Sequence, residues 1–265
     1  MLSKAILKEL SRIKTKKGRD LQGRFLIEGL RLCEEAADSS WPIESVLFTA
    51  SFEQKPRGKD LLRKLQELNA KMVQVKTQDI EKLSDTVTAQ GIVCVLKRKS
   101  HPVEDLWTGD LRLVVALDGI RDPGNVGTLI RAADAFGADA IVLSYDTVEL
   151  YSPKLVRSTM GSIFHLPIYD DLNLEKTISE LKKREFRILG TDAKKGRDLG
   201  ATDTSGRICL LIGNEAEGLS KSLHDLSDEI VHIPLCGRAE SLNVAVAGGI
   251  LLYEIARKRT CPPTL

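Results

Sequence analysis

The strongest fold signal in this sequence is an apolar run that ends abruptly in glycines and polar residues. Leu113–Leu117 reads LVVAL, and Asp118–Asn125 follows it directly with the sequence DGIRDPGN. A continuous apolar run of this length predicts a strand buried on both faces, as in a parallel sheet. Open α/β sheets bind ligands at the carboxyl ends of such strands. The stretch therefore predicts a parallel α/β sheet with a ligand site at its edge.

The second half of the chain repeats this alternation of strand and helix. Apolar runs predict further strands, and helical spacing of apolar residues predicts the segments between them. The strands are Ala140–Leu143, Arg187–Gly190, Ile208–Ile212 and Ile230–Ile233, and the helices are Val126–Phe136, Leu174–Phe186 and Leu242–Lys258. Helices between strands indicate a mostly parallel sheet covered on both faces.

The first part of the chain also reads as α/β but with shorter strands. The predicted strands are Phe25–Ile27, Val46–Phe48, Met72–Val75 and Ile92–Leu96. A polar stretch with proline and glycine then separates the two halves. We therefore predict a small α/β domain over residues 1–98, a linker over residues 99–110 and a larger α/β domain over residues 111–265.

Charge and cysteine usage bear on location and partners. The net charge of the 265 residues is only +2, but basic residues crowd the N-terminus. Such clusters can contact phosphates, although any single one is as readily a solvated surface residue. The candidate contacts to the phosphates of a nucleic acid are Lys14, Lys16, Lys17, Arg19 and Arg24.

The five cysteines are scattered, with no C-x-x-C pair and no histidine at ligand spacing. This pattern predicts neither a structural zinc nor any other metal site. An odd number of cysteines fits a reducing cytoplasm. We also expect no secretory signal peptide and no membrane-spanning segment, since no apolar run is long enough.

Two further loops in the second half carry polar residues after a strand. The first contains Gly213, Asn214 and Glu215, and the second leads from Ile233 through a glycine loop to Ser241-Leu242-Asn243. In the loop after Leu113–Leu117, Gly124-Asn125-Val126-Gly127 breaks the glycine spacing of a dinucleotide-binding motif, and no G-K-[ST] follows as a Walker motif requires. Taken singly, these residues have simpler roles, such as a helix cap for Asn125 or Ser241 and a surface position for Arg131.

Together the three loops resemble the motifs of the SpoU (TrmH-type) RNA methyltransferases, which belong to the SPOUT superfamily. The resemblance rests on Asn125-x-Gly127-x-x-x-Arg131, Gly213-Asn214-Glu215, and Ile233-Pro234-Leu235 with Ser241-Leu242-Asn243-Val244. It implies a C-terminal parallel sheet with a deep trefoil knot, preceded by a small α/β RNA-binding domain. Gly23–Ala36 is similar to part of that preceding domain. Ala216 and Ala245 depart from the residues that are frequent in the family at those positions.

The resemblance also implies a function, which is methyl transfer from S-adenosylmethionine to a ribose 2′-hydroxyl. Ribosomal RNA is the favoured substrate because of the appended domain, and a homodimer is expected. The implied catalytic residues are Arg131, Asn125, Glu215, Ser241 and Asn243. The implied cofactor-binding residues are Leu189, Gly190, Thr191, Gly213, Ile233, Leu235 and Leu242.

Several alternatives stay open from the sequence alone. The substrate could be transfer RNA, the methylated atom could be on a base, or the chain could be an RNA-binding protein without activity. A nucleotide-dependent oxidoreductase is a further alternative, and the missing dinucleotide motif speaks against it. The target nucleotide, the proton acceptor and the biological purpose cannot be read from the sequence.

Overall fold

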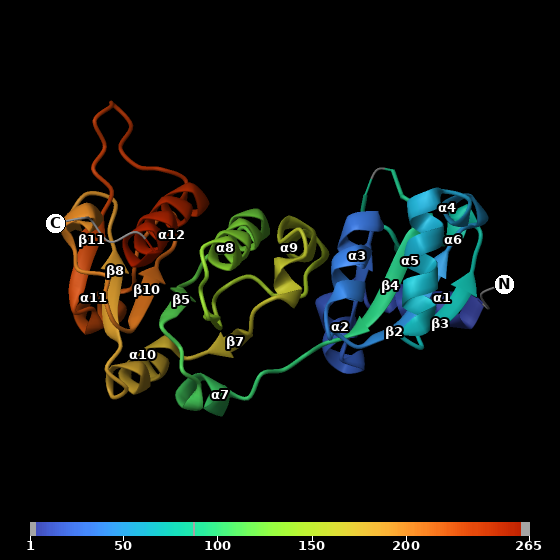
Figure 1. The fold of residues 1–265 in the computed structure, drawn as a ribbon, viewed down its shortest axis with the longest axis horizontal. Coiled ribbons are helices and arrows are strands. Elements are labelled where there is room, and N and C mark those ends of the chain that lie inside the picture. The colour runs from blue at the N-terminus through green and yellow to red at the C-terminus, as the bar shows by residue number, and fades with distance from the viewer. Residues whose placement is uncertain (1–3, 87, 261–265) are drawn as a thin grey trace. The chain divides into compact units, whose positions relative to one another are not determined.

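The computed structural model describes residues 4–86 and 88–260, which form two compact units. The first unit comprises the chain up to Lys99 together with Glu149–His165, and the second comprises Ser100–Val148 and the chain from Leu166 onward. The ribbon is drawn in Figure 1. The first unit therefore contains a segment of 149–165 that the sequence assigns to the second domain.

A four-stranded mixed sheet forms the centre of the first unit, in the order β1-β4-β2-β3. β1 and β2 run antiparallel to β4, and β3 runs parallel to β2. The strands are β1 (Arg24–Glu28), β2 (Ile43–Phe48), β3 (Lys71–Gln74) and β4 (Ile92–Lys97). The helices are α1 (Lys4–Arg12), α2 (Lys16–Gln22), α3 (Leu30–Asp38), α4 (Ala50–Glu53), α5 (Pro56–Glu67), α6 (Thr77–Leu83) and α9 (Pro153–Ser158), with a 3₁₀ turn η1 (Ser162–Phe164).

The 149–165 segment packs into the first unit through aromatic and ionic contacts. The Tyr151 ring lies 4.7 Å from that of Phe25, and the Phe164 ring lies 5.3 Å from that of Trp41. Glu149 pairs with Arg19. The apolar residues of this segment, such as Leu150, Leu155 and Ile163, indicate that it is buried, but a sequence pattern does not report against which unit it packs.

A parallel sheet forms the second unit, in the order β7-β6-β5-β10-β8-β11-β9, and all of its pairings are parallel. This confirms the predicted α/β class. Its strands are β5 (Leu113–Leu117), β6 (Ala140–Ser144), β7 (Ile168–Leu172), β8 (Arg187–Thr191), β9 (Arg197–Asp198), β10 (Ile208–Ile212) and β11 (Glu229–His232). Its helices are α7 (Val103–Thr108), α8 (Pro123–Ala135), α10 (Leu174–Lys182), α11 (Lys221–Leu226) and α12 (Val244–Thr260), with a 3₁₀ turn η2 (Leu199–Ala201).

The order of the strands reverses between β5 and β10. From β5 the chain proceeds outward to β6 and β7, whereas β10 is flanked on its other side by β8 and β11. Such a reversal is where open α/β sheets place their ligands, because the connections leave in opposite directions and open a crevice. The loops that follow β5 and β10 lie at this point.

Two helices of this unit differ from the expectation. The predicted linker contains α7, whose Leu106 is 1% exposed and packs in the core with Ile178 and Leu181. In α12 the sequence pattern predicts Val246 and Ile250 on the buried side, but they are 53% and 41% exposed. The buried apolar residues of this helix are Val244, Ala245, Leu251, Leu252 and Ile255.

Candidate active site

The loop after β5 is shaped by a helix cap that the sequence assigned to another residue. The carboxylate of Asp122, and not the amide of Asn125, caps α8: Asp122 Oδ1 accepts a 2.9 Å hydrogen bond from the Asn125 N–H. Pro123 follows at the first helical position, where its fixed φ suits a helix start. The side chain of Asn125 is thus free for other partners.

The loop after β10 turns back sharply on itself. Asn214 Oδ1 accepts a 2.9 Å hydrogen bond from the Ala216 N–H, and Asn214 and Gly218 exchange backbone hydrogen bonds. A Cβ atom on Gly213 would lie 2.3 Å from the carbonyl carbon of Gly218, so only glycine permits this turn. Asn214 Nδ2 also donates to Gly119 O at 2.7 Å, which joins the loops after β5 and β10.

Three predicted catalytic side chains meet in one hydrogen-bonded chain. Asn125 Nδ2 donates to Glu215 Oε1 at 2.7 Å, and Asn243 Nδ2 donates to Asn125 Oδ1 at 3.0 Å. Asn243 Oδ1 accepts from the N–H of Ala245 at 2.9 Å at the start of α12. A carboxylate only accepts hydrogen bonds, so this chain fixes the orientation of both amides.

The other two predicted catalytic residues lie outside this hydrogen-bonded chain. Arg131 is exposed, and no hydrogen bond or ion pair of its side chain is found within residues 4–86 and 88–260. It follows Asn125 by six residues, which puts it about 120° around the axis of α8. Ser241 is exposed and borders the cavity beside the chain. Asn243 caps α12, so Ser241 is not its cap.

A cavity of about 400 Å³ lies at the carboxyl ends of β8, β10 and β11. Of the seven predicted cofactor residues it is lined by Thr191, Gly213, Ile233, Leu235 and Leu242. Leu189 and Gly190 do not line it. Leu189 is fully buried within β8, and a Cβ atom on Gly190 would lie 2.4 Å from Ser227 Oγ, so both residues serve packing.

Some lining residues were not predicted from the sequence. Asp192, Lys194 and Lys195 follow β8, and His232 ends β11. The sequence signal that points to these residues is their position at the end of a predicted strand or shortly after it. Nδ1 of His232 is buried and has no hydrogen-bond partner in the described part of the chain, so a polar atom in this wall is left for another group to satisfy.

Three of the five predicted RNA contacts are engaged within the protein. Arg19 is 4% exposed and bonds Glu149 through two nitrogens, and Lys14 pairs with Asp85 at 2.9 Å. Arg24 pairs with Glu9 and Glu44. Lys16 and Lys17 are exposed on α2 and are the two that stay accessible. The four aromatic residues Phe25, Trp41, Phe48 and Phe52, which could otherwise stack on bases, are buried in the core of this unit.

Two searches of the described residues bear on metals and membranes. Within them, no group of three or more His, Cys, Asp or Glu side chains has a geometry that could hold a metal ion. None of the helices they form is both long and apolar enough to cross a membrane. Cys33, Cys94 and Cys209 are buried and Cys236 is exposed, all as free thiols, and Cys261 lies outside the described residues.

Family models match both parts of the chain. The SpoU rRNA Methylase family model matches residues 112–253, and the MRM3-like substrate binding domain model matches residues 4–94. The chain belongs to the SpoU rRNA methylase family. The SpoU match contains all three predicted motifs, and the second match covers the sheet of the first unit except for the end of β4.

Individual members of the SpoU family are similar over nearly the whole chain. The 23S rRNA (guanosine(2553)-2′-O)-methyltransferase RlmP of Bacillus subtilis is 35% identical, covering 94% of this chain and 95% of the relative. The SpoU methyltransferase AviRb of Streptomyces viridochromogenes, solved with AdoMet, has a TM-score of 0.88 at 28% identity, covering 98% and 99% of the two chains. An AdoMet-bound rRNA methyltransferase of Sinorhizobium meliloti has a TM-score of 0.85 at 33% identity, covering 98% and 96%.

Proposed function

We propose that this protein transfers a methyl group from S-adenosylmethionine to a ribose 2′-hydroxyl of ribosomal RNA. The observation that carries the proposal is the hydrogen-bonded chain Asn243–Asn125–Glu215. It joins the loops at the point where the strand order reverses, and its Glu215 lines a ligand-sized cavity at the ends of β8, β10 and β11. Family membership and the names of full-length relatives supply the reaction and the class of RNA. Two relatives matched over most of this chain are named as 23S rRNA enzymes, which favours ribosomal over transfer RNA.

The cavity fits S-adenosylmethionine in size and chemistry. Its volume of about 400 Å³ is within the usual range for small-molecule sites. Ile233, Leu242 and Leu251 offer apolar walls for a purine. Asp192 and Glu217 bring carboxylates and Lys194 and Lys195 bring ammonium groups, a mixture suited to a ligand that carries both positive groups and a carboxylate. The unpartnered Nδ1 of His232 gives a polar position in the same wall. When bound, this cofactor supplies an electrophilic methyl group on a positively charged sulfur.

On the RNA side, we assign Arg131 to the phosphate next to the reacting ribose. An arginine stays protonated and is a poor base, but its planar fork holds a phosphate through two hydrogen bonds. Because the Arg131 side chain has no hydrogen-bond or ion-pair partner among the described residues, its guanidinium is available to bind a phosphate. Asn125, Glu215, Ser241 and Asn243 would orient the ribose. Positioning of the hydroxyl supplies much of the rate gain in such a transfer.

A homodimer is part of the proposal and is supported by α12. Val246, Ile250 and Tyr253 recur at helical spacing and are 53%, 41% and 52% exposed. An exposed apolar stripe of this kind suits a second copy of the same surface. Light scattering of the Ile250→Asp variant should report a monomer, and an unchanged dimer would remove this face from the interface.

The trefoil knot is likewise a proposal, supported by how the end of α12 is held. Lys258 Nζ donates to the carbonyl oxygens of Leu199, Gly200 and Thr202, at 2.8, 2.7 and 2.8 Å. Arg259 donates to Thr204 O and Gly206 O. The end of the last helix is therefore bonded to the loop before β10. The expected cytoplasmic location and independence from metal ions remain predictions.

Incubation with labelled S-adenosylmethionine and unmodified total RNA tests the function. Label should enter large-subunit ribosomal RNA at one position. Alkaline hydrolysis should leave the bond on the 3′ side of that nucleotide uncut, because a 2′-O-methyl group blocks cleavage there. Cleavage at the labelled nucleotide would show that a base is methylated instead of the ribose. Label in transfer RNA would show that transfer RNA is the substrate. Absence of label from every RNA would indicate an RNA-binding protein without methyltransferase activity.

A further inference from the structure

A groove of about 540 Å³ on the first unit lies between the start of α3, the loop before β4 and the end of α9. Its three acidic side chains have partners inside the protein. Glu28 Oε2 accepts from the Asp85 N–H at 3.1 Å, Glu34 pairs with Arg57 at 2.7 Å, and Glu35 pairs with His165 at 3.3 Å. Each of these carboxylates thus has a hydrogen-bond or ionic partner, and Arg57 neutralises the charge of Glu34.

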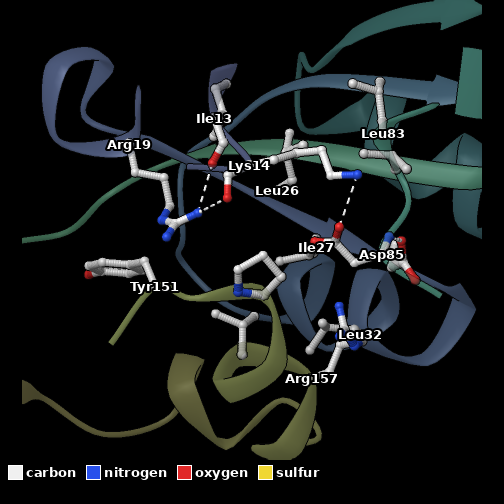
Figure 2. Close-up of a pocket in the computed structure, with 14 residues that line it drawn as sticks. Ile13, Lys14, Arg19, Leu26, Ile27, Leu32, Leu83, Asp85, Tyr151 and Arg157 are labelled. Carbon is white, nitrogen blue, oxygen red and sulfur yellow. Dashed lines mark hydrogen bonds and ion pairs between the residues drawn. The ribbon is translucent and has the colours of Figure 1, made fainter. Parts of the chain in front are cut away.

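Two arginines in this groove are not committed. No hydrogen bond or ion pair joins the side chain of Arg31 or Arg157 to any other described residue. Arg157 is half-buried and also borders a smaller cavity beside the groove, where Figure 2 shows it next to Leu32 with no dashed line reaching it. A half-buried guanidinium has five N–H donors to satisfy, so its free state favours an anionic ligand.

Polar and apolar groups complete the groove. Gln90 Oε1 accepts a 2.9 Å hydrogen bond from the Leu30 N–H, which fixes the amide and leaves Nε2 as a donor. Met160 is 39% exposed and has a φ of 53°, a conformation that few side chains adopt without a compensating role. Its neighbour Gly161 is pressed against α3, since a Cβ atom there would lie 2.5 Å from Glu35 Cγ.

We infer that this groove binds an unpaired stretch of the substrate RNA, an inference that rests on the proposed function. Arg31 and Arg157 would hold backbone phosphates, and Met160 would contact the face of a base or ribose. Proteins read RNA mostly at such unpaired segments, where bases are free of their stack. Phosphates suit arginine pairs, and an RNA strand presents both a phosphate and an apolar base face at every nucleotide.

The chain connectivity links this groove to the methyltransferase sheet. Arg157 and Met160 belong to the 149–165 segment, which connects β6 to β7. RNA held in the groove would therefore also hold the segment that joins two strands of the catalytic unit. None of the five basic residues predicted from the sequence lines the groove.

Filter binding to an unmodified transcript of Bacillus subtilis 23S rRNA, measured across a range of KCl concentrations, tests the inference. Arg157→Gln and Arg31→Gln should each weaken binding by about 10-fold and reduce the slope of log K against log salt by about one. The matched control is Arg63→Gln, because Arg63 is an exposed arginine of α5 outside the groove, with a loose 3.7 Å ion pair. It should stay within about two-fold of the unaltered protein.

Met160→Ala separates the apolar from the ionic part of the contact. It should weaken RNA binding while leaving the salt slope unchanged, since no charge is removed. Thermal unfolding of each variant checks that the fold is intact. The inference would be overturned if Arg31→Gln and Arg157→Gln bind RNA with the same affinity and the same salt slope as the Arg63→Gln control. A failure of the unaltered protein to methylate RNA would overturn the proposed function alone, because the binding comparison needs no turnover.

Discussion

The side-chain amide of Asn125 donates a 2.7 Å hydrogen bond to the carboxylate of Glu215, 90 residues further along the chain. This bond joins the first turn of α8 to the loop after β10, two segments that follow neighbouring parallel strands. Because Asn243 bonds the other end of the same amide, three segments are held in one geometry. The predictions below begin from this contact.

Replacing Asn125 with alanine should reduce turnover by about 100-fold, the scale seen when one oriented polar group of a catalytic site is lost. Affinity for S-adenosylmethionine should change little, because Asn125 does not line the cavity. Single-turnover methylation and calorimetry give the two values. The control is Glu104→Gln, an exposed carboxylate of α7. Equal losses of affinity and turnover would mean that Asn125 acts through the cavity instead.

Arg131→Lys should abolish turnover although it keeps the positive charge. Lysine offers a point charge where the guanidinium offers a planar fork, so the phosphate loses its bidentate partner. Cofactor affinity should stay near normal in calorimetry. Arg63→Lys serves as the control for the same exchange at an exposed site. Turnover of the Arg131→Lys variant at the level of the unaltered protein would remove Arg131 from the catalytic set.

Gly213→Val should weaken binding of S-adenosylmethionine severely. Its Cβ atom would lie 2.3 Å from a backbone carbon of Gly218, so the 214–218 loop that lines the cavity would have to move. Isothermal calorimetry on the purified variant measures this directly. Gly237→Ala is the control, since a Cβ atom there meets nothing within 4 Å. An unchanged dissociation constant for Gly213→Val would place the cofactor elsewhere.

Gly248→Ala and Gly249→Ala should change stability in opposite directions. A Cβ atom on Gly248 would lie 2.2 Å from Leu129 Cδ2 and 3.0 Å from Ile212 Cδ1, both within the core, which predicts a loss of about 1–3 kcal/mol. Gly249 meets nothing within 4 Å, so alanine should stabilise the helix there by about 1 kcal/mol. The free energy of unfolding of both variants is measured by urea denaturation. Equal changes in the two variants would contradict the packing of α12 seen in the structure.

Arg19→Met should destabilise the first unit by about 3–5 kcal/mol, because it leaves the Glu149 carboxylate buried without its partner. The two side chains are 5% and 12% exposed. The Arg19→Met, Glu149→Met double variant should regain the part of that loss that comes from the unpaired carboxylate, whereas the carbonyl oxygens of Ile13 and Lys14, which accept hydrogen bonds from Arg19, stay without this donor. Lys17→Ala should leave the midpoint of thermal unfolding unchanged. If the Arg19→Met variant is as stable as the unaltered protein, the ion pair of Arg19 and Glu149 contributes little to the free energy of unfolding.

From the sequence alone, five of the seven strands of the second sheet and the three motifs could be predicted. The predicted bounds of Leu113–Leu117 and Ile208–Ile212 agree with the structure, because strands buried on both faces of a parallel sheet must be apolar throughout. The glycine and polar residues that follow these strands are unfavourable inside a buried strand, so the sequence also predicted loops at the strand ends. β7 and β9 were missed, because their polar or short sequences carry no such continuous run.

The roles of individual polar side chains, in contrast, could be assigned only once the folded arrangement of the segments was known. Asn125 and Asp122 are both good helix caps, and the choice of Asp122 depends on where Glu215 and Asn243 come to lie. Arg19 reads as a surface charge until Glu149 is placed against it. The spacing of apolar residues shows which positions of one helix or strand are buried. The partner of a polar side chain is instead determined by contacts between segments that are far apart in the chain.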